Sequence, residues 1–409
     1  DPTATGEGSA TGDPTATGEG SATGDPTAKG QTRSDTRASG QDNVIPFPRH
    51  PGETPGGLNG LNGLKGFGAV DDAVGEALKS GWLTQGRELQ ELTERGVKLL
   101  QRRVVPVAGG AAAAHLALLA LDLDPGDEVV LPALVPPSLA NLVLLAGGRP
   151  VFADIVAPES PVLDPDDVAR RSTPATRVIV AYHPAGHPAP AAALAGLADS
   201  LGIPLIEVCW DALGARLAGR PVGTFGVAGA FALHRAPDGG GLVACAGDQL
   251  RGRIEELRST AVGTSEEVFE HDVEAFLGNG YRINEAAAAA GVRELETLAQ
   301  RIAERRSIVE RVRRGATGTT TLAFAPGYLP TAEPSYDALP VLAPSTAAAA
   351  SLANRARLAR LGAVLPQPAY RFAPHNARLP RVLLPKTEEY CARAVELPVV
   401  EELLSFPLP

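Results

Sequence analysis

The sequence contains no methionine, and its 409 residues include only five lysines, which are Lys29, Lys65, Lys79, Lys98 and Lys386. Its three cysteines show no CxxC spacing, which excludes a disulfide framework and a cysteine-based zinc site. No apolar run reaches about 18 residues, so no membrane span is predicted. We therefore expect a reduced, cytoplasmic protein without a metal site.

Basic side chains are also in deficit. Lys and Arg together number 37 against 47 Asp and Glu, and the formal net charge is −10. This balance argues against nucleic acid as a partner, because binding to a phosphate backbone needs a basic surface. The length is compatible with two or three domains, or with one large α/β domain and an appendage.

Residues 1–43 are predicted to be a disordered tail. The string DPTATGEGSATG fills residues 1–12, recurs unchanged at 13–24, and begins a third time at Asp25. Its Gly, Ser, Thr, Ala and acidic residues bury too little apolar surface to offset chain entropy. The segment also lacks the basic start and the apolar core of a signal peptide.

From about residue 70, short apolar segments alternate with segments rich in Ala and Leu. The apolar segments predict strands buried on both faces, at 129–131, 150–152, 178–181, 204–206 and 230–233. The intervening segments predict helices, at 111–121, 138–146, 165–171 and 190–201. This order favours a mixed, mostly parallel α/β sheet with helices on both faces.

A change of pattern follows a long predicted helix at 285–314. Pro and Gly become frequent from about 315, and short strands surround one further helix near 346–361. We therefore assign residues 44–314 to a large domain and residues 315–409 to a small, reduced C-terminal α/β subdomain.

Several separated blocks carry a family resemblance across residues 44–409. They include 77–86, 115–118, 147–154, 219–226, 231–234, 281–285 and 397–409. In order and spacing these blocks resemble the DegT-type sugar aminotransferases, which are pyridoxal phosphate (PLP) enzymes of fold type I. The resemblance implies the PLP-transferase fold and a dimer with the active site at its interface.

The resemblance also shows where this chain departs from the family at the cofactor. The family's Schiff-base lysine falls at Pro237, three residues after His234. The family's aspartate for the pyridine nitrogen falls at Val208, with Asp211 three residues further on. Proline and valine can provide neither the amine nor the acid that PLP chemistry needs.

Three further positions depart in the same way. The family's Ser-Gly-Thr phosphate turn reads Gly109-Gly110-Ala111 here, which keeps the backbone donors but loses the hydroxyl groups. The aromatic residue over the ring falls at Pro136, and the asparagine before Tyr281 and Arg282 falls at Gly280. The sequence thus predicts a degenerate cofactor pocket that holds no cofactor, or PLP if another lysine serves. The residues of this pocket are Gly110, Ala111, Pro136, Val208, Asp211, Pro237, Gly280, Tyr281 and Arg282.

Two histidines are candidates for acid–base chemistry in this pocket. His183 and His234 each end a predicted strand, and both also have an ordinary interpretation as hydrogen-bonded structural residues. Three functions therefore stay open. The chain is a non-catalytic accessory partner in a sugar or natural-product pathway, as a homodimer or with an active paralogue; or a PLP-independent enzyme with a nucleotide-sugar-like or small metabolite in the cleft; or a conventional PLP-dependent sugar transaminase.

Overall fold

The computed structural model describes residues 74–81, 83–233, 239–259, 278–315, 321–324, 328–369, 379–380 and 382–408. The chain divides into two units, Asp1–Pro48 and Arg49–Pro409, and every described residue belongs to the second. The predicted tail therefore lies outside the described residues. Among those residues, no helix combines the length and apolarity that a membrane crossing requires.

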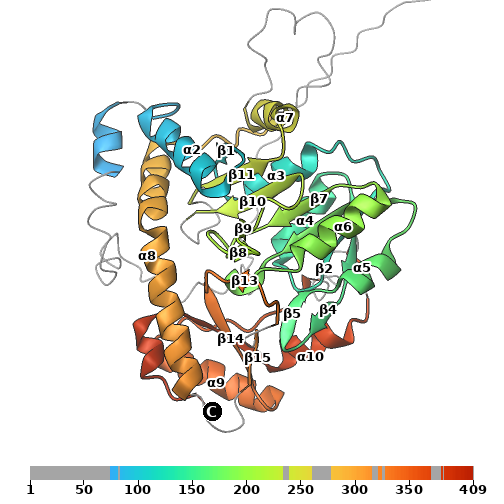
Figure 1. Ribbon diagram of the computed structural model, residues 1–409, viewed down its shortest axis with the longest axis vertical. Coiled ribbons are helices and arrows are strands. Elements are labelled where there is room, and N and C mark those ends of the chain that lie inside the picture. Colours follow the sequence, from blue (N-terminus) through green and yellow to red (C-terminus); the bar gives the residue numbers. More distant parts are fainter. Residues whose placement is uncertain are drawn as a thin grey trace, which may run out of the picture. The chain divides into compact units, whose positions relative to one another are not determined.

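A seven-stranded sheet forms the centre of this unit. Figure 1 shows this sheet between helices. Strand β11 runs antiparallel to β1 and β10, and the pairs from β10 to β3 are parallel. The prediction of a mixed, mostly parallel sheet is thus confirmed. In spatial order the strands are β1 (Arg103–Val107), β11 (Gly241–Cys245), β10 (Ala228–Ala232), β7 (Leu205–Val208), β6 (Thr176–Tyr182), β2 (Glu128–Pro132) and β3 (Arg149–Ala153).

Helices cover both faces of this sheet because its strands are apolar on both sides. In β2, Val129 and Leu131 pack into the cluster that holds α3 and α4, whereas Val130 packs into the cluster that holds α5 and α6. The helices around the central sheet are α2 (Arg87–Leu100), α3 (Gly110–Leu119), α4 (Pro137–Leu145), α5 (Pro165–Arg171), α6 (Ala191–Leu201) and α7 (Asp248–Arg258).

The long helix α8 (Glu285–Gly315) connects this region to the C-terminal elements. Ile308, Val309 and Val312 near its end pack against a second, antiparallel sheet. That sheet contains β12 (Thr321–Leu322), β14 (Ala338–Leu342) and β15 (Ala394–Pro398), and its helices are α9 (Thr346–Leu358) and α10 (Pro385–Arg393). The domain boundary at 314 stays a prediction.

Short elements complete the described chain. The strands β8 (Arg216–Leu217), β9 (Arg220–Pro221) and β13 (Ala332–Glu333) form one small sheet, and β4 (Ile155–Ala157) pairs with β5 (Ser160–Leu163). Two 3₁₀ turns, η2 (Pro184–Gly186) and η6 (Glu401–Leu404), follow β6 and β15. Because η2 follows β6 directly, it lies where the parallel strands end.

Candidate functional site

The carboxyl ends of the parallel strands meet at one edge of the central sheet. In open α/β sheets this edge is where ligands bind. Helix α3 begins there after β1, Trp210 and Asp211 follow β7, and His183 follows β6. These residues define the candidate site.

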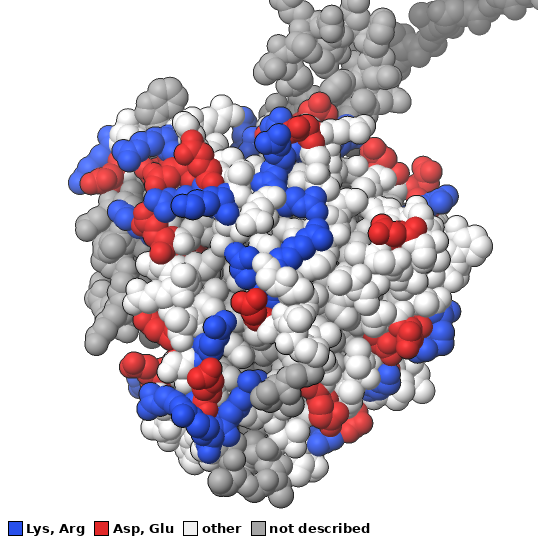
Figure 2. All heavy atoms as spheres, in the orientation of Figure 1, with Lys and Arg blue, Asp and Glu red and all other residues white. Residues whose placement is uncertain are grey.

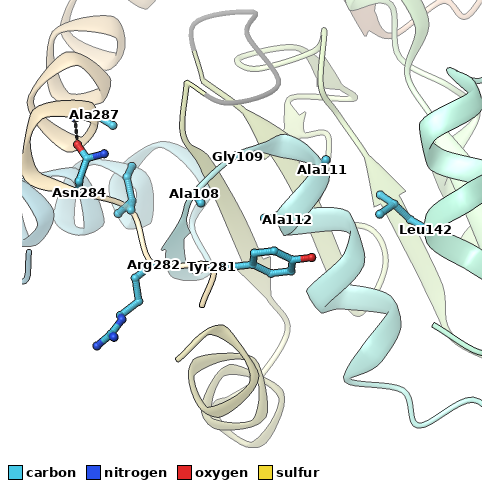
Figure 3. Close-up of a pocket in the computed structure, with 10 residues that line it drawn as sticks. Ala108, Gly109, Ala111, Ala112, Leu142, Tyr281, Arg282, Asn284 and Ala287 are labelled. Carbon is cyan, nitrogen blue, oxygen red and sulfur yellow. Dashed lines mark hydrogen bonds between the residues drawn. The ribbon is translucent and has the colours of Figure 1, made fainter. Parts of the chain in front are cut away.

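A cavity of about 340 Å³ lies beside the start of α3. Its lining includes Gly109, Ala111, Tyr281, Arg282 and Asn284. Figure 3 shows the Tyr281 ring directed toward α3 and the Arg282 side chain directed away from it. Because Gly109 at the N-cap has no side chain, the first N–H groups of α3 receive no side-chain acceptor from this position. These N–H groups and the helix dipole make this end of the cavity suitable for an anion.

The Tyr281 ring is held by a buried histidine of α3. The Tyr281 hydroxyl lies 3.0 Å from Nδ1 of His115. Burial lowers the pKa of His115, which favours the neutral imidazole. The pair therefore fixes the ring at the cavity wall without adding a charge there.

The end of β7 is apolar at position 208, where the resemblance implies an aspartate. Val208 is fully buried in the core cluster that contains Ala112 of α3. Two residues later, the Trp210 indole donates from Nε1 to the carbonyl oxygen of Gly110 at 2.8 Å. A separate, smaller cavity of about 20 Å³ lies beside Trp210, Asp211 and Ala232. That space holds about one water molecule and no aromatic ring.

Asp211 belongs to a polar network that links β7 to the C-terminal segment. Its carboxylate accepts a hydrogen bond from the Tyr182 hydroxyl at 2.6 Å, and its backbone oxygen accepts one from Ser335 at 3.2 Å. Burial and the charge of Asp211 raise the pKa of Tyr182 well above its usual range. Nearby, Arg305 pairs with Asp337 at 3.3 Å.

His183 is placed deep in the structure and not in the cavity. Its side chain is fully buried, Nδ1 accepts from the Ala189 N–H at 2.9 Å, and Nε2 donates to Glu207 at 3.1 Å. An acid–base group needs a nitrogen that reaches the substrate. The geometry thus favours a structural role for His183 over the predicted acid–base role. His234 and Pro237 lie outside the described residues, so the predictions about them stay predictions.

Glu207 gives His183 that structural role. Its two oxygens also accept from the N–H groups of Gly223 at 2.8 Å, Phe225 at 2.6 Å and Gly226 at 2.9 Å. Gly223 has φ +79, and a Cβ there would lie 2.3 Å from the Phe231 ring, so this turn needs glycine. The buried carboxylate thereby fixes the loop between β9 and β10.

The other predicted pocket positions contribute backbone geometry. Pro136 precedes α4 as its N-cap, and Gly280 has φ +63 and donates to the Ser259 carbonyl at 3.1 Å. Neither residue supplies a ring or an amide side chain. Sequence reasoning missed Trp210 and Tyr182, although Trp210 is one of only two tryptophans in the chain and follows a predicted strand.

Three of the lysines lie among the described residues, and Lys386 adjoins the carboxyl end of β3, where its backbone N–H donates to Asp154 at 3.2 Å. Lys98 lies in the last turn of α2, and Lys386 Nζ pairs with Asp164 at 3.1 Å near α5. Lys79 is exposed and precedes α2. None of these three lysines lines either cavity described above.

Comparison with known proteins identifies the relatives. Residues 68–405 match the DegT/DnrJ/EryC1/StrS aminotransferase family. The GDP-perosamine synthase of Vibrio cholerae is 30% identical over 251 residues, which cover 60% of this chain and 67% of that protein.

Solved structures agree with this match. The aminotransferase TlmJ from Streptoalloteichus hindustanus has a TM-score of 0.74 at 26% identity, covering 82% of this chain and 93% of its own. S. venezuelae DesV, in complex with a ketimine intermediate, has a TM-score of 0.74 at 24% identity, covering 85% and 94%. These likenesses confirm the PLP-transferase fold.

The family match corrects the expectation that the chain takes no cofactor. Aminotransferases of this family are PLP-dependent, so the comparisons point to PLP. The prediction of no cofactor, drawn from Pro237 and Val208, is therefore wrong. Single positions matched by resemblance do not establish that a group held by several contacts is lost.

The described residues meet only part of what PLP requires. The N–H groups at the start of α3 fit its phosphate. By contrast, neither cavity is lined by a described lysine that could provide an amine. No chemical step through PLP follows from this arrangement.

Proposed function

The chain belongs to the DegT/DnrJ/EryC1/StrS aminotransferase family, and from that premise we propose that it is a member without lysine-dependent transaminase activity. In this proposal it is an accessory or structural partner in a sugar or natural-product biosynthetic pathway. Members of the family are typically dimers, and we propose a homodimer or a heterodimer with a catalytically active relative. The likeness to a GDP-perosamine synthase supports a pathway that handles nucleotide sugars.

The absence of an amine at the described site carries this proposal. PLP supplies an electrophilic aldehyde and an electron-accepting ring to an amine, and the enzyme must provide a lysine to hold it covalently. Lys79, Lys98 and Lys386 line neither of the two cavities described above. Lys29 and Lys65 lie outside the described residues, and the family position itself corresponds to Pro237.

This chain's own residues give the site a binding role. The first turn of α3 holds a phosphate-type anion through backbone N–H groups, and Tyr281 forms the wall of the cavity. Trp210 closes the adjacent space over β7 through its bond to Gly110. A phosphorylated ligand is thus bound beside α3 and is not directed toward an amine.

Borohydride trapping tests the proposal. The purified full chain is titrated with PLP, reduced with borohydride and mapped by mass spectrometry, while transaminase turnover is measured with nucleotide-sugar substrates. We expect PLP binding without a reduced lysine adduct and without turnover. The matched variant Ala111→Asp places a carboxylate at the first turn of α3, and we expect it to weaken PLP binding by about tenfold or more.

A stoichiometric lysine adduct would overturn the proposal and would identify the chain as a conventional PLP-dependent transaminase. The partner role is tested separately by co-expression with a catalytically active family member. We expect a stable complex on gel filtration with altered turnover of the active chain. A chain that elutes alone and leaves that turnover unchanged contradicts the heterodimer.

The Tyr182–Asp211 pair favours a second candidate, a repurposed enzyme acting on a nucleotide-sugar-like or small metabolite. A carboxylate 2.6 Å from a phenol is a geometry that can transfer a proton. If this candidate is right, turnover of such a metabolite will be lost in both Asp211→Asn and Tyr182→Phe. Because Ala111→Asp alters only the α3 end, it separates this activity from anion binding.

A further inference from the structure

Two arginines meet on the edge of the central sheet opposite the candidate site. Arg102 lies directly before β1, and Arg220 lies in β9. Both guanidinium groups donate to the backbone oxygen of Thr224, and Nε of Arg220 also donates to the Thr224 hydroxyl at 3.0 Å. Because β1 has five residues at roughly 3.3 Å each, this edge is about 16 Å from the start of α3.

Neither guanidinium group forms an ion pair with a carboxylate among the described residues. The neighbouring Arg103 pairs with Asp248 at 3.0 Å, so that acid is already engaged. Glu207 faces the same loop from inside, where its oxygens accept from three backbone N–H groups and His183. Burial and the charge of Arg220 lower the pKa of Arg102, as expected for two cations held together.

Arg220 is exposed and Arg102 is half-buried, and both are anchored to Thr224. The guanidinium carbon of Arg220 lies 4.4 Å from the centroid of the Phe225 ring, a cation–π contact. Thr224, which accepts from both guanidinium groups, is itself buried. Figure 2 shows a band of basic side chains across the part of this face where Figure 1 places β8 and β9.

We propose that Arg102 and Arg220 form a binding site for a phosphate-type oxyanion, such as the phosphate group of a small metabolite. Each guanidinium carries five N–H donors, and the bonds to Thr224 use one from Arg102 and two from Arg220. The remaining donors belong to two cations that share the Thr224 oxygen as an acceptor. A tetrahedral anion with several acceptor oxygens can bind donors from both guanidinium groups. The site is independent of PLP and of the proposed accessory function.

Isothermal titration of the full chain with inorganic phosphate tests this site, with chloride holding the ionic strength constant. We expect saturable binding that Arg220→Gln weakens by about tenfold or more, and that Arg220→Lys weakens less because it keeps the charge. The matched control is Arg103→Gln, an adjacent cation already paired with Asp248, which should change the affinity by less than about twofold.

Ala111→Asp distinguishes this site from the start of α3. We expect it to leave phosphate binding at Arg102 and Arg220 intact, and we expect Arg220→Gln to leave the α3 site intact. Loss of all binding in Ala111→Asp, equal losses in the Arg103 and Arg220 variants, or no saturable binding would each overturn the proposal. Because substitution of Arg220 also removes its hydrogen bonds to the buried Thr224, circular dichroism checks that each variant keeps its fold.

Discussion

Replacement of Glu207 by glutamine tests how the loop before β10 is held. In the structure, one carboxylate oxygen accepts from Phe225 and Gly226, and the other accepts from Gly223 and His183. A glutamine amide has one acceptor oxygen and one donor group. In either orientation, therefore, two of the four donors lose their acceptor and face an N–H group instead.

The expected cost follows from this count. A buried donor left without an acceptor costs about 1–3 kcal/mol, so two such donors predict a loss of roughly 2–6 kcal/mol of unfolding free energy. His183 cannot relieve the clash by changing its tautomer, because its Nδ1 already accepts from Ala189. The Glu207 side chain is fully buried and Phe225 and Gly226 are half-buried, so solvent cannot replace the acceptors lost at Gly223 and His183.

Urea unfolding followed by circular dichroism measures this loss as a lower midpoint at an unchanged slope. The matched control is Glu389→Gln, which alters a carboxylate that is half exposed and paired with Arg393 on α10. We expect that control to change stability by less than about 1 kcal/mol. Equal midpoints for the two variants would refute the reasoning, since the buried bonds would then contribute no more than a surface pair.

Three further predictions concern single side chains. Burial raises the pKa of Glu396 from 4.5 to about 7. Between these two values the folded chain keeps a proton that the unfolded chain releases, so the unfolding free energy falls as pH rises. In thermal melts between pH 5 and pH 8, Glu396→Gln should remove up to about 3 kcal/mol of this loss. Burial lowers the pKa of His187 to about 3. The neutral imidazole therefore stabilises the folded chain, and this contribution is lost as pH falls below the ordinary histidine pKa of 6.5. In thermal melts at pH 4 and pH 7, His187→Phe should lose less stability in acid than the native chain. Gly110→Ala should cost roughly 1–3 kcal/mol, measured by melting temperature, because its Cβ would lie 2.7 Å from that of Ala232.

The architecture was readable from the sequence where strands are buried on both faces. Continuous apolar segments such as 129–131 and 178–181 coincide with β2 and β6, because central parallel strands have no solvent side. Strand β1 was not among the predicted strands, and it contains Pro106, a residue type that is unfavourable within a sheet. The structure explains the tolerance, because β1 lies at the edge of the sheet, where a missing donor is acceptable.

The candidate site was less readable because its contacts join distant segments. The resemblance placed Val208, Asp211 and Tyr281 in the pocket region, and the structure puts all three at or near the carboxyl edge. The bond from Trp210 to Gly110 spans a hundred residues, and no local pattern predicts it. For His183, the position after a predicted strand suggested an acid–base role. The structure shows instead that both ring nitrogens form hydrogen bonds, to Glu207 and to Ala189.

The neighbouring residues Glu207 and Val208 have separate structural roles in β7. Successive side chains of a strand point to opposite faces, so Glu207 holds the loop before β10 while Val208 packs with α3. A substitution at position 208 should therefore leave the four hydrogen bonds of Glu207 in place. Contacts that hold the scaffold and contacts that face α3 are thus separable at the level of adjacent residues.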